Sequence, residues 1–277
     1  MQTLACGRFR LDLRRPLLMG IVNLTPDSFS GDGVGHSVAA AVAHAQAQLE
    51  AGADILDLGA ESSRPGAPPV TAEDEMARLL PVLRALRDVP VPLSVDTAKA
   101  EVMTAALAEG ASMINDILAL QAPGALEAVA ARDAAVCLMH MQGEPRTMQA
   151  NPSYGDVVAE VKDFLARRAA ACTAAGIDAS RIVLDPGFGF GKTLAHNLAL
   201  LNRLGELHEL GFPVLAGLSR KSMLGAITGR PVDDRVHASV AAAVLAAERG
   251  ASIIRVHDVA ATHAALAVLQ ALAAGGE

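Results

Sequence analysis

Acidic, amide and basic residues that could bind or activate a substrate recur along this sequence, each close after a short apolar run. In chain order they are Asn23, Asp57, Glu61, Asp96, Asn115, Asp116, His140, Asp185, Ser219, Arg220, Lys221, Arg255 and His257. Any one of them could instead cap a helix or form a hydrogen bond with the backbone at the end of a strand. Their recurrence at equivalent places indicates a shared site rather than a set of separate local roles.

One group of these residues combines hydrogen-bond acceptors with a single ammonium. It consists of Asp96, Asn115, Asp185 and Lys221. Carboxylates would repel a phosphate, whereas they accept hydrogen bonds from the N–H groups of a planar heterocycle. We therefore predict that this group binds a flat ring with several donors.

A second group, Asn23, Arg255 and His257, has the opposite preference. Arginine offers two parallel N–H donors to an anion, and histidine adds a further donor. The side-chain carbonyl oxygen of Asn23 is a suitable ligand for Mg²⁺. This group predicts a site for a phosphate-type substituent, with Mg²⁺ beside it.

The segment LDPGFGFGKT, residues 184–193, resembles a nucleotide-binding loop only at first sight. A P-loop ending at residues 191–193 needs a glycine at position 186, where Pro186 has no N–H group to offer. The dinucleotide-binding spacing also fails, because its last glycine would fall on a lysine or a leucine. The glycines instead let the backbone bend tightly, and Phe188 or Phe190 can face a flat ligand.

Short strands alternating with helices are the elements expected to position these residues. The apolar runs, typical of buried parallel strands, are LLMGIV (17–22), DILDL (54–58), VPLSV (91–95), SMIND (112–116), AVCLMH (135–140), RIVLD (181–185), PVLAG (213–217) and SIIRVH (252–257). A doubly wound sheet usually has about five or six strands, so eight favour an α/β fold with one (β/α)8 TIM barrel over residues 1–277. In such a barrel the polar strand ends crowd the C-terminal face of the strands, where active sites lie.

Helix signals support the same fold. SVAAAVAHAQAQLEAG (37–52) and TAEDEMARLLPVLRALRDV (71–89) have helical spacing, Thr71 is a good helix start, and a closing helix is expected at 259–273. Glycines expected to end helices are Gly52, Gly110, Gly176, Gly211 and Gly250. Two polar, glycine-rich loops, 23–37 and 59–70, are expected to act as lids over the mouth.

Bulk composition argues against several classes of protein. Hydrophobic residues make up 52% of the 277 residues, with one Tyr and no Trp, which predicts an aliphatic core. A net charge of -7 without a basic cluster argues against nucleic-acid binding. Cys6, Cys137 and Cys172 lack metal-type spacing, and Cys137 is expected to be a buried, inert thiol. Without an apolar leader or a membrane-spanning run, we expect a cytoplasmic protein with no membrane partner.

Motifs distributed along the chain, in this order and spacing, resemble the dihydropteroate synthase family of folate biosynthesis. They are NLTPDSFS, ESSRPGA, SVDTAK, INDI, CLMHMQG, LDPGFGFGK, SRKSM and RVHDV. The resemblance covers residues 17–260, and the ordered set is highly specific. It implies a (β/α)8 barrel that condenses (7,8-dihydropterin-6-yl)methyl diphosphate with 4-aminobenzoate to 7,8-dihydropteroate, releasing diphosphate. It also implies Mg²⁺, a homodimer and inhibition by sulfonamides.

The resemblance implies roles for individual residues of this chain. Contacts to the pterin fall on Asp96, Asn115, Asp185 and Lys221, with Met139 and Phe190 as apolar walls and Arg255 over the ring. The implied Mg²⁺ ligand is Asn23, and the implied diphosphate contacts are Ser63, Arg255 and His257. The implied surroundings of 4-aminobenzoate are Phe29, Arg64, Pro65, Lys221 and Ser222. The residues implied in catalysis are Asp32, Lys221, Arg255 and His257.

Three positions depart from the family pattern. Ser63 stands where the family usually has threonine, so the hydroxyl is retained. The sequence SFSGDG places Asp32 one residue later than the family's S-F-S-D-G-G, which puts in question its role in stabilising a developing cation. Leu118 stands where an arginine often follows I-N-D-I, and we have no interpretation of it.

Three other functions are open at this stage. A methyltetrahydrofolate methyltransferase would share the pterin acids but has no need of a diphosphate site, so ESSRPGA and RVHDV argue against it. A non-catalytic homologue has only the altered first loop in its favour. A generic phosphate-binding barrel would not explain the acceptors Asp96, Asn115 and Asp185.

Overall fold

The central element of the protein is a parallel sheet closed into a barrel. The computed structural model describes residues 2–24, 38–62, 69–145 and 147–275. The strands are β3 (Leu17–Asn23), β4 (Ile55–Gly59), β5 (Leu93–Asp96), β6 (Met113–Asp116), β7 (Ala135–Met139), β8 (Ile182–Asp185), β9 (Leu215–Ala216) and β10 (Ile253–Val256). They form an 8-stranded sheet in the order β8-β7-β6-β5-β4-β3-β10-β9.

The two ends of this sheet also meet. A parallel bridge pairs Leu184 of β8 with Val214, just before β9. The N–H group of Leu184 donates to the carbonyl oxygen of Pro213 at 2.9 Å. The predicted (β/α)8 barrel is therefore confirmed. The expectation that residues 1–277 form one domain stays a prediction.

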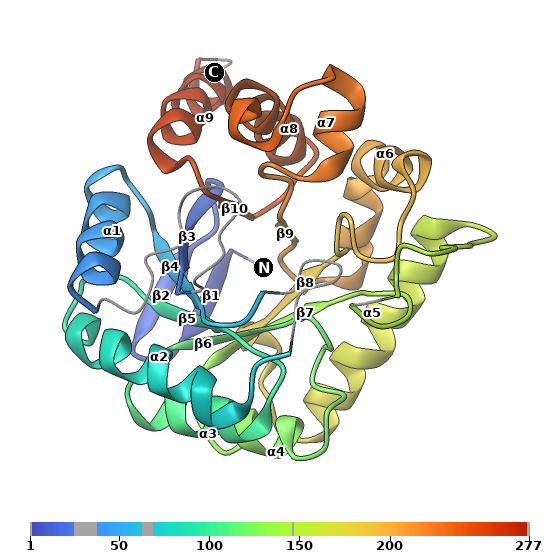
Figure 1. The fold of residues 1–277 in the computed structure, drawn as a ribbon. Coiled ribbons are helices and arrows are strands. Elements are labelled where there is room, and N and C mark those ends of the chain that lie inside the picture. Colours follow the sequence, from blue (N-terminus) through green and yellow to red (C-terminus); the bar gives the residue numbers. More distant parts are fainter. Residues whose placement is uncertain (1, 25–37, 63–68, 146, 276–277) are drawn as a thin grey trace.

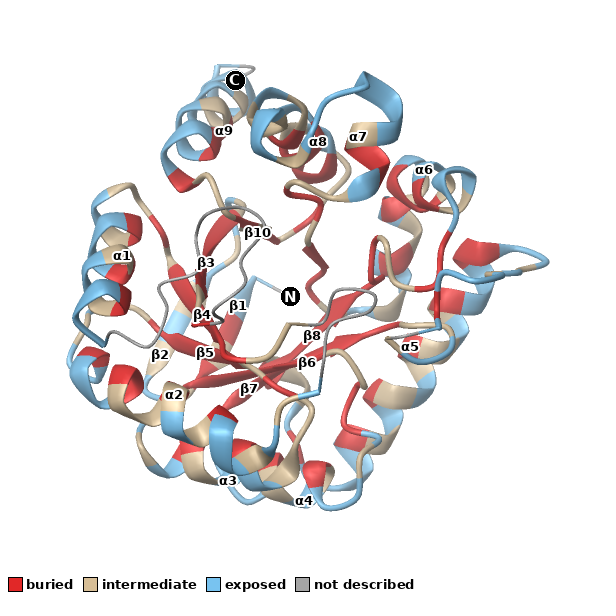
Figure 2. Ribbon diagram, in the orientation of Figure 1, coloured by how far each residue is buried: buried red, intermediate tan, exposed pale blue. Residues whose placement is uncertain are grey.

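Helices surround the barrel in the order of the sequence (Figure 1). They are α1 (Val38–Glu50), α2 (Ala72–Leu86), α3 (Ala100–Ala108), α4 (Ala125–Ala130), α5 (Val157–Ala174), α6 (Leu194–Asn202), α7 (Ser222–Thr228), α8 (Val236–Glu248) and α9 (Val259–Ala274). Short 3₁₀ turns lie at Ala179–Arg181, Leu204–Leu210 and Val232–Asp234. Buried residues line the strands and the inward faces of the helices, and exposed residues lie outside (Figure 2).

The expected helix boundaries are largely confirmed. The five glycines predicted to end helices have positive φ, from +79° at Gly211 to +104° at Gly110. At the start of α2 the hydroxyl oxygen of Thr71 accepts the N–H group of Asp74 at 3.1 Å. Because the chain leaves each helix at a defined residue, the following strand enters the barrel in a fixed register.

An antiparallel hairpin, β1 (Thr3–Cys6) and β2 (Phe9–Asp12), precedes the barrel and is absent from the prediction. The thiol of Cys6 donates to the carbonyl oxygen of Ser112 at 3.1 Å, and the N–H group of Gly7 donates to that of Asp133 at 3.0 Å. Both acceptors lie just before strands, so the hairpin covers the amino end of the barrel. Its strands have only four residues each and are too short to stand out in the sequence.

The barrel interior is filled by aliphatic and sulfur side chains. This cluster comprises Leu4, Cys6, Leu17, Met19, Ile55, Met113, Ala135, Cys137, Val183, Leu215 and Ile253. A larger cluster fills the space between strands and helices. Cys137 is fully buried and free, and burial raises the pKa of its thiol well above the ordinary value, as expected for an inert cysteine. The packed interior leaves the carboxyl ends of the strands as the place for a site.

Candidate active site at the mouth of the barrel

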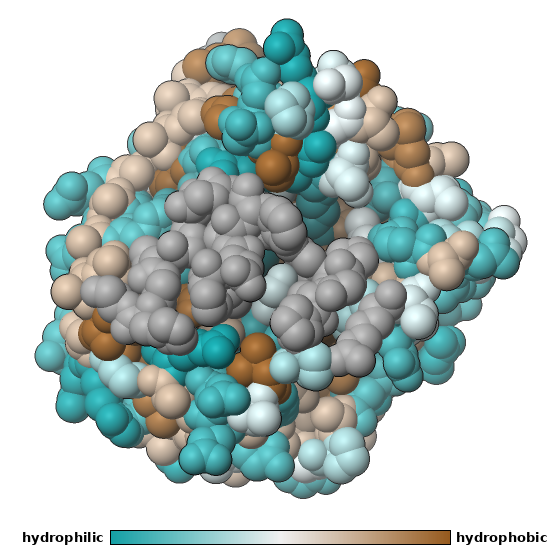
Figure 3. All heavy atoms as spheres, in the orientation of Figure 1, coloured by the Kyte–Doolittle hydropathy of each residue, from teal (hydrophilic) through white to brown (hydrophobic). Residues whose placement is uncertain are grey.

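The carboxyl ends of the parallel strands meet at one face of the barrel. Strand register places Asp96 of β5 beside Asn115 of β6, and Met139 of β7 beside Asp185 of β8. Asn23 is the last residue of β3, which lies between β4 and β10. In the space-filling view, hydrophilic residues cover much of the described surface, with apolar ones between them (Figure 3). The structure thus brings predicted site residues from distant parts of the chain to the same end of the barrel.

Arg255 of β10 crosses the mouth and pairs with the acids of β4 and β5. Its Nε donates to Oδ2 of Asp57 at 2.6 Å, and its Nη2 donates to Oδ2 of Asp96 at 2.8 Å. The amide of Asn115 donates to the same Asp57 oxygen at 3.2 Å. Arg255 was expected over the pterin ring and beside the diphosphate, and its long side chain in addition provides the counter-charge for two acids.

Asp57 is a site residue that the sequence analysis did not select as a substrate contact. Its side chain is fully buried, and its Oδ1 atom has no hydrogen-bond partner within the described residues. A buried oxygen without a partner is energetically costly. Asp57 was expected near a strand end, whereas the structure places it in the middle of β4, and no signal in the sequence distinguished a buried acid from a helix cap.

Burial shifts the protonation of the acids around Arg255. Burial raises the pKa of Asp96 to about 7, with Arg255 lowering it and nearby Asp57 raising it further. Burial also raises the pKa of Asp185, against the effects of Lys221 and of the N–H group of Gly187, which donates to Oδ1 at 2.7 Å. Such shifts gather at functional sites because charged groups there are kept out of water.

Lys221 provides the ammonium of the mouth. Its Nζ donates to the carbonyl oxygen of Phe188 and lies 4.5 Å from the centre of the Phe190 ring. Burial lowers its pKa to about 8, while the carboxylate of Asp185 acts in the opposite direction. Phe188 is fully buried in the core, so Phe190 is the aromatic ring that lies beside the site. Ser222 follows as the exposed first residue of α7.

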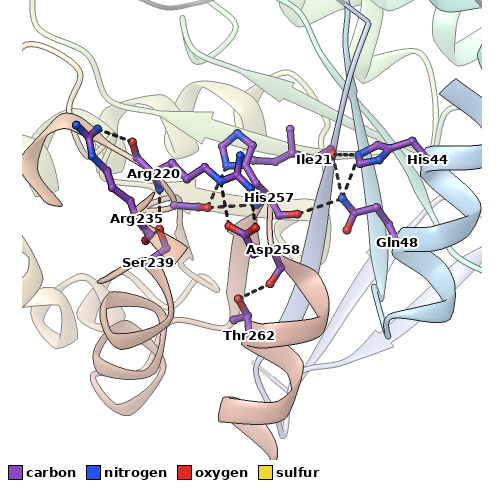
Figure 4. Close-up of polar contacts among 10 residues, drawn as sticks. Ile21, His44, Gln48, Arg220, Arg235, Ser239, His257, Asp258 and Thr262 are labelled. Carbon is purple, nitrogen blue, oxygen red and sulfur yellow. Dashed lines mark hydrogen bonds and ion pairs between the residues drawn. The ribbon is translucent and has the colours of Figure 1, made fainter. Parts of the chain in front are cut away.

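His257 is held on its Nδ1 side (Figure 4). Oγ of Ser219 lies 3.0 Å from His257 Nδ1, and it also accepts the backbone N–H group of His257 at 3.2 Å. The hydroxyl can donate its own proton to Nδ1 while it accepts that N–H group. In the neutral tautomer that this bond favours, Nε2 carries the hydrogen and is the donor.

A network of arginine and aspartate fixes the loops after β9 and β10 (Figure 4). Arg220 has a φ of +58°, which is rare for a residue with a side chain. Its guanidinium donates to both oxygens of Asp258, at 3.0 and 2.6 Å. Its backbone N–H group donates to Oγ of Ser239 at 2.9 Å, and Arg235 donates to its carbonyl oxygen at 3.1 Å. Since Arg220 precedes Lys221 and Asp258 follows His257, this network positions both site residues.

Gln48 of α1 ties the ends of β3 and β10 together (Figure 4). Its buried amide donates to the carbonyl oxygens of Ile21 at 3.4 Å and His257 at 3.2 Å. The contact keeps Asn23, two residues after Ile21, near His257. Gln48, which was not among the predicted site residues, therefore links the two strands whose ends carry the predicted anion-binding residues.

Five predicted site residues belong to parts of the chain that the structure does not describe. Phe29, Asp32, Ser63, Arg64 and Pro65 lie outside the described residues, as do most of the two loops expected to form lids. Their roles stay predictions. The same holds for the substrate contacts assigned to the described residues, whose positions are now known.

The chain that forms this site is similar to a known family of enzymes. Residues 19–257 match the family described as pterin binding enzyme. The chain is therefore a member of the pterin-binding enzymes. Within the described residues, no helix is both long and apolar enough to cross a membrane.

Individual relatives narrow the class. The dihydropteroate synthase of Neisseria meningitidis serogroup B is 54% identical over 96% of both chains. The Yersinia pestis dihydropteroate synthase, solved as a sulfonamide drug complex, is 49% identical with a TM-score of 0.96 over 98% of this chain and 99% of that one. The Burkholderia cenocepacia enzyme, complexed with 7,8-dihydropteroate, is 52% identical with a TM-score of 0.91 over 99% and 97%. This chain thus belongs to the dihydropteroate synthase family.

Proposed function

We propose that this protein condenses (7,8-dihydropterin-6-yl)methyl diphosphate with 4-aminobenzoate, forming 7,8-dihydropteroate and diphosphate. The observation that carries the proposal is the gathering of Asp96, Asn115 and Asp185 with Lys221 at one end of the barrel. The name of the Neisseria relative and the product bound in the Burkholderia structure support the same reaction.

The buried acceptors suit the donor-rich edge of a pterin. Its amino group and ring N–H groups resemble a guanidine, which a carboxylate binds through paired hydrogen bonds. Asp185, which is buried, provides such a carboxylate, and Lys221 can donate to the ring carbonyl or a ring nitrogen. A ring lacking these donors would leave buried oxygens unpaired, which gives the site its selectivity.

The reaction breaks the bond between the pterin methylene carbon and the diphosphate oxygen, and diphosphate leaves with the electron pair. The positive charge that develops on the methylene spreads into the electron-rich pterin. The carboxylates of Asp57 and Asp96 lie at the mouth, where they can stabilise that charge. The amine of 4-aminobenzoate attacks the carbon and then loses a proton. Because an arylamine is neutral at pH 7, no strong general base is needed.

We assign the leaving diphosphate to the side of the mouth that is formed by the neighbouring strands β3 and β10. The Nε2 side of His257 can donate to a diphosphate oxygen, because Ser219 holds the Nδ1 side. Arg255 can exchange one of its carboxylate partners for the diphosphate. Ser63 and the acid Asp32 remain predicted contributors from the loops.

Mg²⁺ is part of the proposal as a partner of the diphosphate. The side-chain oxygen of Asn23, at the end of β3, is a donor of the kind that Mg²⁺ prefers. The described residues contain no group of three or more His, Cys, Asp or Glu that could hold a metal ion. Mg²⁺ commonly takes one or two protein oxygens and completes its shell with phosphate and water, so Asn23 fits this arrangement. When bound, the ion would neutralise charge on the leaving diphosphate.

A homodimer and a cytoplasmic location complete the proposal. Exposed apolar side chains on the neighbouring helices α8 and α9 include Leu245, Val268 and Leu272. These side chains could be buried in an interface with a second copy of the chain. Sedimentation of the purified protein would measure its oligomeric state.

The three cysteines are free, which agrees with a reducing compartment. Cell fractionation tests the location.

The decisive experiment mixes the purified protein with the pterin diphosphate, 4-aminobenzoate and Mg²⁺. Chromatography should show 7,8-dihydropteroate, with diphosphate released in equal amount. Omitting either substrate provides the control. Tight pterin binding without product would favour a non-catalytic homologue, and methyl transfer from methyltetrahydrofolate would favour the methyltransferase.

A further inference from the structure

The motif Gly191-Lys192-Thr193, which mimics the end of a P-loop, has two separate uses in this fold. Thr193 caps α6: its hydroxyl oxygen accepts the N–H group of His196 at 3.2 Å, and its own N–H group donates to His196 Nδ1 at 3.3 Å. The side chain of Lys192 is buried instead, with the residue only 3% exposed. The proposed reaction assigns this buried lysine no task.

The atoms within hydrogen-bond distance of the Lys192 amine are neutral acceptors. Burial lowers the pKa of Lys192 to about 7, while the charge of Asp185 acts in the opposite direction. Its Nζ lies 3.0 Å from the carbonyl oxygens of both Gly187 and Phe190 and 3.3 Å from that of His140. His140 Nδ1 is the nearest acceptor, at 2.9 Å. An ammonium has three hydrogens to share among these atoms, so the side chain links two backbone segments.

The two segments linked by Lys192 are in close contact. They are the loop of residues 186–191 after β8 and the chain of residues 140–142 after β7. A Cβ atom on Gly187 would lie 1.9 Å from the carbonyl oxygen of His140, and one on Gly191 would lie 2.4 Å from that of Gln142. Both glycines also have positive φ, at +68° and +61°. The loop therefore reaches this position only with glycines.

The same loop supports the substrate site on its other side. The N–H group of Gly187 donates to Asp185, and the carbonyl oxygen of Phe188 accepts from the ammonium of Lys221. The ring of Phe190 lies 4.5 Å from that ammonium. A displacement of the loop would thus move the partners of both Asp185 and Lys221.

We propose that Lys192 is a positioning residue, whose buried ammonium fastens the loop of residues 186–191 to the end of β7 and so places Asp185 and Lys221 for the pterin. It acts through the loop rather than by touching substrate. The inference rests on the proposed function for the identity of the ligand. The protonation of its neighbour fits this role, because burial and the charge of Lys192 lower the pKa of His140 to about 3 and keep Nδ1 an acceptor.

The test compares the wild type with Lys192→Met, which keeps the chain length but removes the donors. Calorimetry with the pterin diphosphate alone should show binding weakened about tenfold or more, because the hydrogen bonds that tie the loop to the end of β7 are lost. The KM for 4-aminobenzoate, at saturating pterin diphosphate, should change less than the pterin affinity does, because only Lys221 among its predicted contacts is held by this loop. Lys192→Gln retains two donors and should fall between the two proteins.

Lys162→Met is the matched control, because Lys162 lies on the outer helix α5 and pairs with Glu209. It should bind the pterin diphosphate like the wild type. The proposal is overturned if Lys192→Met binds with unchanged affinity, or if both substrates weaken equally along with the melting temperature. Since binding is measured without turnover, absence of product in the wild type would count against the proposed reaction alone.

If Lys192→Met does not fold, Tyr154→Phe tests the same loop more gently. The hydroxyl of Tyr154 donates to the carbonyl oxygen of Gly191 at 2.7 Å, so the variant loses one tie on the loop. Pterin affinity should fall about threefold, as expected for one neutral hydrogen bond. Unchanged affinity in both Tyr154→Phe and Lys192→Gln would then overturn the proposal.

Discussion

The two parts of the barrel mouth hold their polar groups in different ways. In the acceptor part, after β4 to β8, the acids Asp57 and Asp96 pair with the guanidinium of Arg255, which reaches across the mouth from β10. In the anion part, after β3, β9 and β10, two neutral side chains hold His257: the hydroxyl of Ser219 contacts its Nδ1, and the amide of Gln48 donates to its backbone carbonyl oxygen. A flat ring needs acceptors that are already fixed and dry, whereas a departing diphosphate needs donors that are free to change partner.

The largest effect is expected at Arg255, which joins the two parts of the mouth. Arg255→Met removes the counter-charge of two acids, so the free energy of unfolding should fall by about 3–5 kcal/mol. Turnover should be lost as well. Urea denaturation measures the change in stability, and Arg255→Lys, which keeps the charge, should lose less. Equal stability of the wild type and Arg255→Met would mean that the acceptor part does not depend on this pairing.

The next largest effect is expected at Asp185, which belongs only to the acceptor part. Asp185→Ala should weaken binding of the pterin diphosphate about a hundredfold, because more than one charge-assisted hydrogen bond is lost. Affinity for diphosphate alone should be unchanged. Asp178→Ala, at an exposed 3₁₀ turn, is the control. Calorimetry that finds full pterin affinity in Asp185→Ala would place the pterin elsewhere.

A smaller effect is expected from the pH dependence of the acceptor part. The pKa of Asp96 is raised from 3.8 to about 7, so its protonated form favours the native state. This contribution is present at low pH and is lost as the pH rises through about 7. Over the same range pterin binding should strengthen as the carboxylate forms. Denaturation and calorimetry at several pH values measure both trends, and Asp96→Asn should flatten them; an identical pH dependence in that variant would assign them to another group.

The smallest effect concerns the support of the anion part. Asp258→Asn should weaken the pairing with Arg220 and lower kcat/KM by about threefold to tenfold through misplacement of Lys221 and His257. The control is Asp234→Asn, which affects the exposed pair with Arg230 on the surface. Steady-state kinetics with both variants decides whether a half-buried pair positions the site. Equal kinetics in the two variants would remove that role from Asp258.

The features that the sequence predicted depend on residues close together in the chain, whereas those it missed depend on contacts between segments far apart in the chain. The apolar runs of the strands, the glycines that end helices and the cap at Thr71 are recognised from neighbouring residues in the chain, and the structure agrees with them. The β1–β2 hairpin escaped prediction because it is stabilised by contacts with the floor of the barrel, such as that of Cys6 with Ser112.

The sequence by itself determined the barrel, because buried parallel strands and glycine-ended helices have local patterns that repeat. It also placed Asn115, Asp185 and Lys221 at strand ends, which a closed barrel gathers at one face. Only the tertiary structure decided that Arg255 joins Asp57 and Asp96, and that Lys192 is buried among carbonyl oxygens. Long side chains choose partners from elements far apart in sequence, and that choice depends on burial and charge in three dimensions.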